Sequence, residues 1–106
     1  MPVRSVRRRY LWIHIETDTK LNETNINEMI EAKIRFLYGV NGLVELNYKQ
    51  IEFLPEKNSA IIRCNHNRLS EMRATLASIT DVDGNPCRVD VKLVSGTIKA
   101  LRKRMN

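Results

Sequence analysis

The sequence predicts one α+β domain in which two helices cover one face of a four-stranded antiparallel sheet, followed by a short C-terminal helix. Four stretches are either alternating apolar and polar or continuously apolar over the length of a strand. Two longer stretches carry apolar residues at helical spacing. A chain of 106 residues has room for one hydrophobic core, so we expect a single domain spanning residues 1–106.

The first predicted element is a strand over residues 10–16. Apolar residues at every second position alternate there with Tyr10, Trp12, His14 and Glu16, a pattern typical of a half-buried strand. Residues 1–8 are polar and basic and contain Pro2, so they are expected to form a flexible basic arm.

The first helix is predicted from Ile26 to Leu37. Asn25 is a good N-cap with Glu28 at the capping-box position, and Gly39 stands where a C-cap belongs. After the turn at residues 39–42, alternation over residues 43–53 predicts the second strand.

The second half of the chain predicts a hairpin, a helix and a last strand. Residues 55–58 connect the second strand to a third over residues 59–65, whose near-continuous apolar character indicates a central place in the sheet. Asn67 is expected to cap a helix over residues 68–79. The fourth strand is expected over residues 87–94 with Val89, Val91 and Leu93 inward, and the chain then turns at Gly96 into the terminal helix.

The order β-α-β-β-α-β fits a ferredoxin-like (RRM-like) sandwich. Right-handed crossovers place the first and third strands in the middle and the fourth beside the first. The end of the fourth strand then lies next to the start of the first, so the two ends of the chain are expected to meet at one edge of the sheet.

The positive charge of the protein is concentrated at the same two chain ends. The chain has 18 Lys and Arg against 12 Asp and Glu, a net charge of +6 and an isoelectric point near 9.7. The whole excess of positive charge comes from the two ends of the chain, which contain no acidic residue. Their cations are Arg4, Arg7, Arg8, Arg9, Lys99, Arg102, Lys103 and Arg104. Such runs are often only solvated, but two runs converging above a slightly acidic body favour an anionic partner, nucleic acid before membrane.

Other candidate sites are weaker. Tyr10 and Trp12 could stack on bases, but the third strand offers Ile61 and Arg63 where an RNA-recognition sheet carries aromatics, so a covering terminal helix is favoured. The backbone N–H groups of Gly96 and Thr97 could bind phosphate, although the spacing favours a plain turn.

The remaining candidate residues give no sign of catalysis. His14 and His66 lack companions at metal-ligand spacing, and no nucleophile–base pair or glycine-rich phosphate loop is recognisable. Cys64 and Cys87 are expected to be free thiols in a reducing compartment. With no membrane span and no secretory signal, the protein is expected to be soluble and cytoplasmic.

Several segments resemble the small-subunit family that includes protein component 2 of archaeal ribonuclease P and is shared with eukaryotic ribonuclease P/MRP. The resemblance covers residues 7 to 102. Its segments are Arg8-Arg9-Tyr10-Leu11, Gly39-Val40-Asn41-Gly42, Ala60-Ile61-Ile62-Arg63-Cys64, Glu71-Met72-Arg73-Ala74-Thr75-Leu76 and Val94-Ser95-Gly96-Thr97-Ile98-Lys99.

This resemblance implies a subunit of the ribonucleoprotein endonuclease that removes the 5′ leader from precursor tRNA. In that family the RNA subunit performs the hydrolysis with Mg²⁺, so no catalytic residue and no cofactor or metal is expected in this chain. The implied partners are the ribonuclease P RNA, the barrel-shaped protein component 3, precursor tRNA through the holoenzyme, and a second copy of this chain.

We expect phosphate contacts from the chain ends, with Arg63 as an addition that could instead pair with Glu16. The expected RNA-binding residues are Arg7, Arg8, Arg9, Arg63, Thr97, Lys99, Arg102, Lys103 and Arg104. Two other hypotheses remain: a free-standing RNA-recognition-type module for single-stranded RNA, and a small acylphosphatase-type enzyme with a phosphate loop at residues 39–42.

Overall fold

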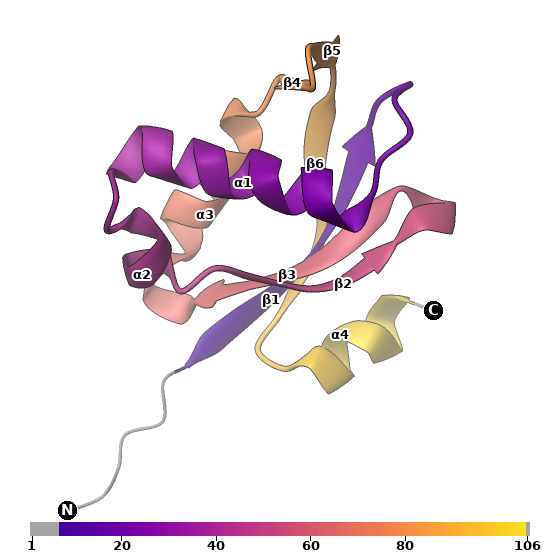
Figure 1. Cartoon of the computed structure of the whole chain (residues 1–106). Helices are drawn as coiled ribbons and strands as arrows, with labels where there is room; N and C mark the ends of the chain where they lie inside the picture. The colour runs from indigo at the N-terminus through magenta and orange to yellow at the C-terminus, as the bar shows by residue number, and fades with distance from the viewer. Residues whose placement is uncertain (1–6, 106) are drawn as a thin grey trace, which may run out of the picture.

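The computed structural model describes residues 7–105 and is built around a four-stranded antiparallel sheet (Figure 1). Its strands are β1 (Arg8–Glu16), β2 (Lys49–Leu54), β3 (Ser59–Asn65) and β6 (Arg88–Ser95). The helices are α1 (Glu23–Tyr38), α2 (Gly42–Leu46), α3 (Leu69–Ser78) and α4 (Ile98–Met105). Short 3₁₀ turns occupy Pro55–Lys57 and His66–Arg68, and the small strands β4 (Asp81–Val82) and β5 (Asn85–Pro86) form a separate ladder.

The strand order β2-β3-β1-β6 confirms the predicted topology. Strands β1 and β3 lie in the centre and β6 pairs with β1, as right-handed crossovers require. Helices α1 and α3 cover one face of the sheet, and α4 lies across the opposite face (Figure 1).

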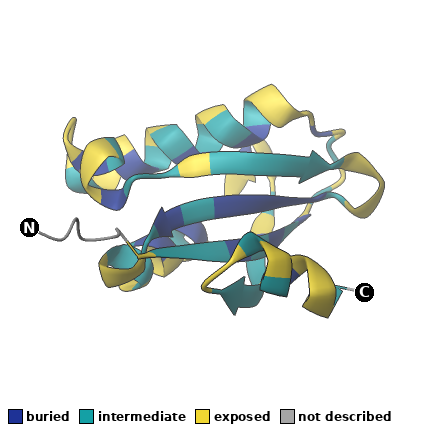
Figure 2. Ribbon diagram, turned by 90° about the horizontal axis from the view of Figure 1, so that it is seen from below, coloured by how far each residue is buried: buried dark blue, intermediate teal, exposed yellow. Residues whose placement is uncertain are grey.

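The main core lies between the sheet and the α1–α3 layer. Leu11, Ile13 and Ile15 point into it from β1, and Ile26, Ile30 and Ile34 meet them from α1 at i, i+4, i+8 spacing, all fully buried. Figure 2 shows burial concentrated in the central strands, with the outward surfaces of α1 and α4 exposed. Each Å² of apolar surface buried in this core stabilises the fold by about 25 cal/mol.

The start of α1 differs from the prediction. The N-cap is Asn22 rather than Asn25, and the two asparagines form a reciprocal capping box: each side chain accepts from the other's backbone N–H at 2.8 Å. Asn25 thus occupies the third helical position, and its side chain accepts the hydrogen bond that a Glu or Gln side chain usually accepts there. The end at Gly39 (φ 80°) is as predicted.

The predicted strand over residues 43–53 is wrong in its first half. Leu43 and Leu46 face the core one helical turn apart, while Val44 is 79% exposed, so the stretch forms α2 and β2 begins only at Lys49. Over so short a segment the order of apolar and polar residues is compatible with either a strand or one turn of helix. The segment is helical because it packs against α1.

Two further predictions were wrong: the N-cap of the second long helix and the inward-facing residues of the last strand. Asn67 lies inside the 3₁₀ turn His66–Arg68, and α3 begins at Leu69 without a side-chain cap. In β6 a bulge at Lys92 reverses the alternation: Val91 pairs with Ile13, but Leu93 pairs with Trp12 and Val94 with Leu11. Val94 therefore packs against the core, and Leu93 faces the other side.

Helix α4 is anchored by a small second cluster on the open face of the sheet. Leu101 and Ile61 are 0% and 1% exposed, yet neither belongs to the main core. Arg102 bridges to Glu52 of β2 at 2.7 Å, and Arg104 donates to the carbonyl oxygen of Val94 at 3.2 Å. A terminal helix over the Trp12 face of the sheet was expected, and α4 occupies that face.

Two other expectations concern the chain as a whole. The predicted flexible arm was residues 1–8; Arg8 belongs to β1, and residues 1–6 lie outside the described part of the chain. Cys64 and Cys87 are both free thiols, as expected. No helix within residues 7–105 is both long enough and apolar enough to cross a membrane.

Candidate nucleic-acid interface

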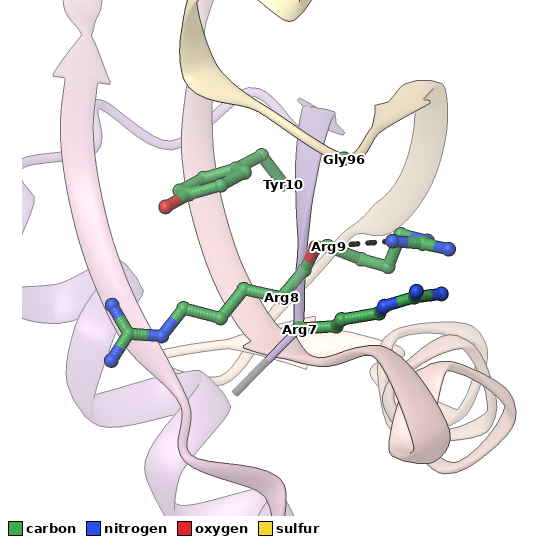
Figure 3. Close-up of a pocket in the computed structure, with 5 residues that line it drawn as sticks. All are labelled: Arg7, Arg8, Arg9, Tyr10 and Gly96. Carbon is green, nitrogen blue, oxygen red and sulfur yellow. Dashed lines mark hydrogen bonds between the residues drawn. The ribbon is translucent and has the colours of Figure 1, made fainter. Parts of the chain in front are cut away.

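The start of β1 and the loop after β6 form a shallow pocket of about 480 Å³, which we call the edge pocket. It is lined by Arg7, Arg8, Arg9, Tyr10 and Gly96 (Figure 3). Tyr10 pairs with Ser95 at the end of β6, so residues 85 positions apart in the sequence become neighbours. The predicted adjacency of the start of β1 and the end of β6 is therefore confirmed.

Local contacts fix how the arginines are presented. The carbonyl oxygen of Arg7 accepts from the backbone N–H of His66 at 3.0 Å, and Arg9 Nη1 donates to the carbonyl oxygen of Arg8 at 3.2 Å. A Cβ placed on Gly96 would lie 3.5 Å from Arg9 Nη1, so the guanidinium rests directly against the loop. Figure 3 shows Arg7 and Arg9 on one side of β1, with Arg8 and Tyr10 on the other.

The edge pocket carries positive charge with no acid beside it. Among the described residues no carboxylate lies within 4.0 Å of the guanidinium groups of Arg7, Arg8 or Arg9. The arginines that do form ion pairs, Arg68 and Arg88 among them, lie on other parts of the molecule. Guanidinium groups held in this way suit planar, bidentate binding of phosphate.

Among the described residues, none of the C-terminal cations Lys99, Arg102, Lys103 and Arg104 lines the edge pocket. Thr97 caps α4, its Oγ1 accepting from the N–H of Ala100 at 3.1 Å, and α4 then runs away from the start of β1 (Figure 1). Lys99 and Lys103 are exposed one turn apart. Arg102 is committed to Glu52 and Arg104 to a backbone oxygen, so both groups already have a partner.

Arg63 lies on the open face of the sheet, opposite Tyr10 in β1 and Lys49 in β2. The alternative pairing with Glu16 is wrong, because Glu16 pairs with Arg88 at the far end of β1. The prediction did not include Lys49. The position of Lys49 beside Arg63 depends on the register of β2. The predicted second strand began at residue 43, whereas β2 begins at Lys49.

The other singled-out residues have ordinary surroundings. His14 Nδ1 lies 3.8 Å from a carboxylate oxygen of Glu16 on its own strand. Burial raises the pKa of the Cys64 thiol to about 11, while the nearby Arg9 charge acts in the opposite direction. Within residues 7–105, no three His, Cys, Asp or Glu side chains are grouped as a metal site would require.

Fold and surface together define a class: a small, basic α+β protein of ferredoxin-like topology, with a terminal helix on the open sheet face and unpaired arginines at the start of β1. Within this class, residues 9–106 match the Rpp14/Pop5 family. The chain belongs to that family.

Relatives of known name agree with this assignment. Ribonuclease P protein component 2 of Pyrococcus furiosus is 30% identical over 99 residues, covering 92% of this chain and 82% of that protein. The protein of the same name from Methanosarcina barkeri is 26% identical, covering 93% and 72%. A chain in the cryo-EM structure of yeast ribonuclease MRP shares the fold, with a TM-score of 0.70 over 98% of this chain at 14% identity.

Proposed function

We propose that this protein is a subunit of ribonuclease P, the ribonucleoprotein that cleaves the 5′ leader from precursor tRNA. The observation that carries the proposal is the family match over residues 9–106, together with relatives named as component 2 of that enzyme. The unpaired arginines at the start of β1 supply the surface that an RNA partner requires.

In this proposal the chain binds and supports the RNA and performs no chemistry itself. The RNA subunit hydrolyses the phosphodiester bond with Mg²⁺, and this chain holds no cofactor. Arg7 and Arg9 in the edge pocket contact phosphates, with Lys99 and Lys103 as the exposed cations of α4. Arg102 contributes less, because Glu52 already neutralises it at 2.7 Å.

The proposed partners follow from the same assignment. They are the ribonuclease P RNA, the barrel-shaped component 3, precursor tRNA through the holoenzyme, and a second copy of this chain, all in the cytoplasm. One exposed apolar surface is available for protein contacts at the corner between α1 and α2, where Phe36, Val40 and Val44 are each about four-fifths exposed (81%, 82% and 79%).

Reconstitution tests this function directly. The cognate RNA and partner subunits are assembled with and without this chain, and precursor-tRNA cleavage is measured at moderate Mg²⁺. We expect cleavage to require the chain. Charge reversal at Arg8, Arg9, Lys103 and Arg104 together should weaken assembly while leaving the circular dichroism spectrum unchanged.

The opposite outcomes are equally clear. Full cleavage without the chain would refute the subunit assignment. Full activity of the quadruple variant at elevated salt would refute the assignment of the RNA-binding surface, because losing phosphate contacts must weaken binding and elevated salt has already lowered the affinity of the assembly.

A further inference from the structure

A second group of cations lies on the open face of the sheet, where the cover provided by α4 ends. Arg63 stands between Tyr10 and Lys49 in the register of β1, β3 and β2, and Arg8 stands opposite Asn65, two positions along β3. Strand pleating puts Arg8, Tyr10, Lys49 and Arg63 on one face. Ile61 precedes Arg63 on that face and is buried, so the group begins immediately beyond the α4 contact.

Within the part of the chain that the structure describes, the charges in this group have no counterion. Lys49 and Arg63 are directly opposite each other, an arrangement of like charges that destabilises a sheet. No carboxylate lies within 4.0 Å of the Arg8, Lys49 or Arg63 charge among residues 7–105. Glu52, the acid of β2 on this face, is occupied by Arg102.

Two hydrogen-bond donors in the group are also unsatisfied. The Nε atoms of Arg8 and Arg63 are shielded from solvent and have no acceptor among residues 7–105. Buried donors without a partner are uncommon in folded proteins because they forfeit their hydration. An anion bound on this face would remove the repulsion between the cations.

The ring of Tyr10 adds a surface of a different kind. It is half-buried in the middle of the group, and Figure 3 shows it on the same side of β1 as Arg8. A flat ring beside guanidinium planes is the combination on which unpaired bases stack in single-stranded nucleic-acid sites. Arg63 stands on β3 where an aromatic residue was expected of such a site, and its planar guanidinium can take that part.

We propose that Arg8, Tyr10, Lys49 and Arg63 form a binding site for a single-stranded RNA segment, here called the sheet-face site. Tyr10 stacks on one unpaired base, and the three cations bind the adjoining phosphates. The proposal rests on the proposed function, since the RNA subunit would supply the segment. It adds Tyr10 and Lys49 to the contacts. Arg8 and Tyr10 also line the edge pocket, whereas Arg7 and Arg9 lie on the other side of β1.

Lys49 is the outermost member of the site. It also borders the groove between α1 and β2, where Glu23, Glu28 and Glu31 lie, although none of these carboxylates is within 4.0 Å of its ammonium group. Arg8, Tyr10 and Arg63 are therefore the members on which the test depends.

Binding of the full-length chain to a fluorescent oligouridylate of about six nucleotides tests the site across a series of salt concentrations. Replacing Arg8 and Arg63 together by Gln should reduce the slope of log K against log salt by about 1.4, which corresponds to two phosphates on a single strand. Tyr10→Leu should weaken binding about tenfold, whereas Tyr10→Phe should bind as the wild type does, because stacking needs the ring and not the hydroxyl.

The matched control replaces Arg35 and Arg73 by Gln. Both are exposed on the helical side of the protein and form no ion pair within residues 7–105. This pair removes the same charge from a surface outside the site, so its salt slope should stay near that of the wild type. Equal slopes for the two double variants, or equal affinities for Tyr10→Leu and Tyr10→Phe, would overturn the proposal.

A measurement on the wild-type chain covers the case of variants that do not fold. Ribonuclease P RNA containing 4-thiouridine is assembled with the wild-type chain and its partner subunits, irradiated and digested. The proposal expects a crosslinked peptide that contains Tyr10 or Arg63. Crosslinks confined to other peptides in an assembly that cleaves precursor tRNA would refute the sheet-face site and leave the subunit assignment intact; an assembly indifferent to the chain would refute the subunit assignment instead.

Discussion

Truncation of Leu101 to Ala should release α4 from the open face of the sheet. The Leu101 side chain is 0% exposed and meets a small cluster outside the main core, together with Ile61. Leu-to-Ala changes at buried sites cost about 2–5 kcal/mol, and a site near the surface that can collapse belongs in the lower part of that range, about 2–3 kcal/mol. For a domain of this size the melting temperature should fall by roughly 10–20 °C.

Urea unfolding measures the loss of stability, and amide hydrogen exchange measures the release of α4. Protection should be lost first over α4, while the amides of β1 and β3 keep their protection relative to global unfolding. Leu37→Ala is the control, because Leu37 on α1 is 41% exposed and the same truncation should cost less than about 1 kcal/mol. Equal costs at the two positions, or unchanged exchange over α4, would contradict the assigned anchoring of this helix.

Two further predictions concern the interior. Gly42→Ala should destabilise the fold by about 1–3 kcal/mol in urea unfolding, because its Cβ would lie 2.9 Å from Tyr38 Cβ; at Gly96 the nearest atom is 3.5 Å away, and an Ala there that cost as much would refute the steric reasoning. Burial raises the Cys64 pKa from 9.0 to about 11, so its contribution to stability is complete below pH 9 and is lost as the pH rises towards 11. Cys64→Ala should lack that alkaline loss, and identical pH profiles for the two proteins would contradict it.

The order of elements could be predicted because each long pattern had one interpretation. Residues 59–65 are largely apolar and form β3 with the predicted bounds, and the isoleucines of α1 repeat at helical spacing. Given that order, crossover handedness alone placed β6 beside β1 and so predicted the proximity of Tyr10 to the loop at Gly96.

Other features depend on contacts that no local pattern encodes. The bulge at Lys92 moves Val94 inward and Leu93 outward, and the α2 segment is helical because Leu43 and Leu46 pack together on the core. That misassigned segment hid Lys49, since its place beside Arg63 depends on where β2 begins. The sheet-face site therefore became visible only once strand register was known.

The partial separation of the two basic ends has a similar cause. The turn at Gly96 was expected, but the direction of α4 after it depends on the burial of Leu101 and on the ion pair between Arg102 and Glu52 of β2. These contacts carry the later cations of α4 away from the start of β1. The arginines of β1 therefore carry most of the proposed RNA contact.

The most direct measurement is the salt dependence of binding between the assembled protein subunits and ribonuclease P RNA. Replacing Arg7 and Arg9 together by Gln should lower the slope of log K against log salt by about 1.4–1.8, the contribution of two phosphate contacts, while the pair at Arg35 and Arg73 leaves the slope unchanged. If the Arg7 and Arg9 variant keeps the wild-type slope and affinity, the edge pocket does not bind the RNA.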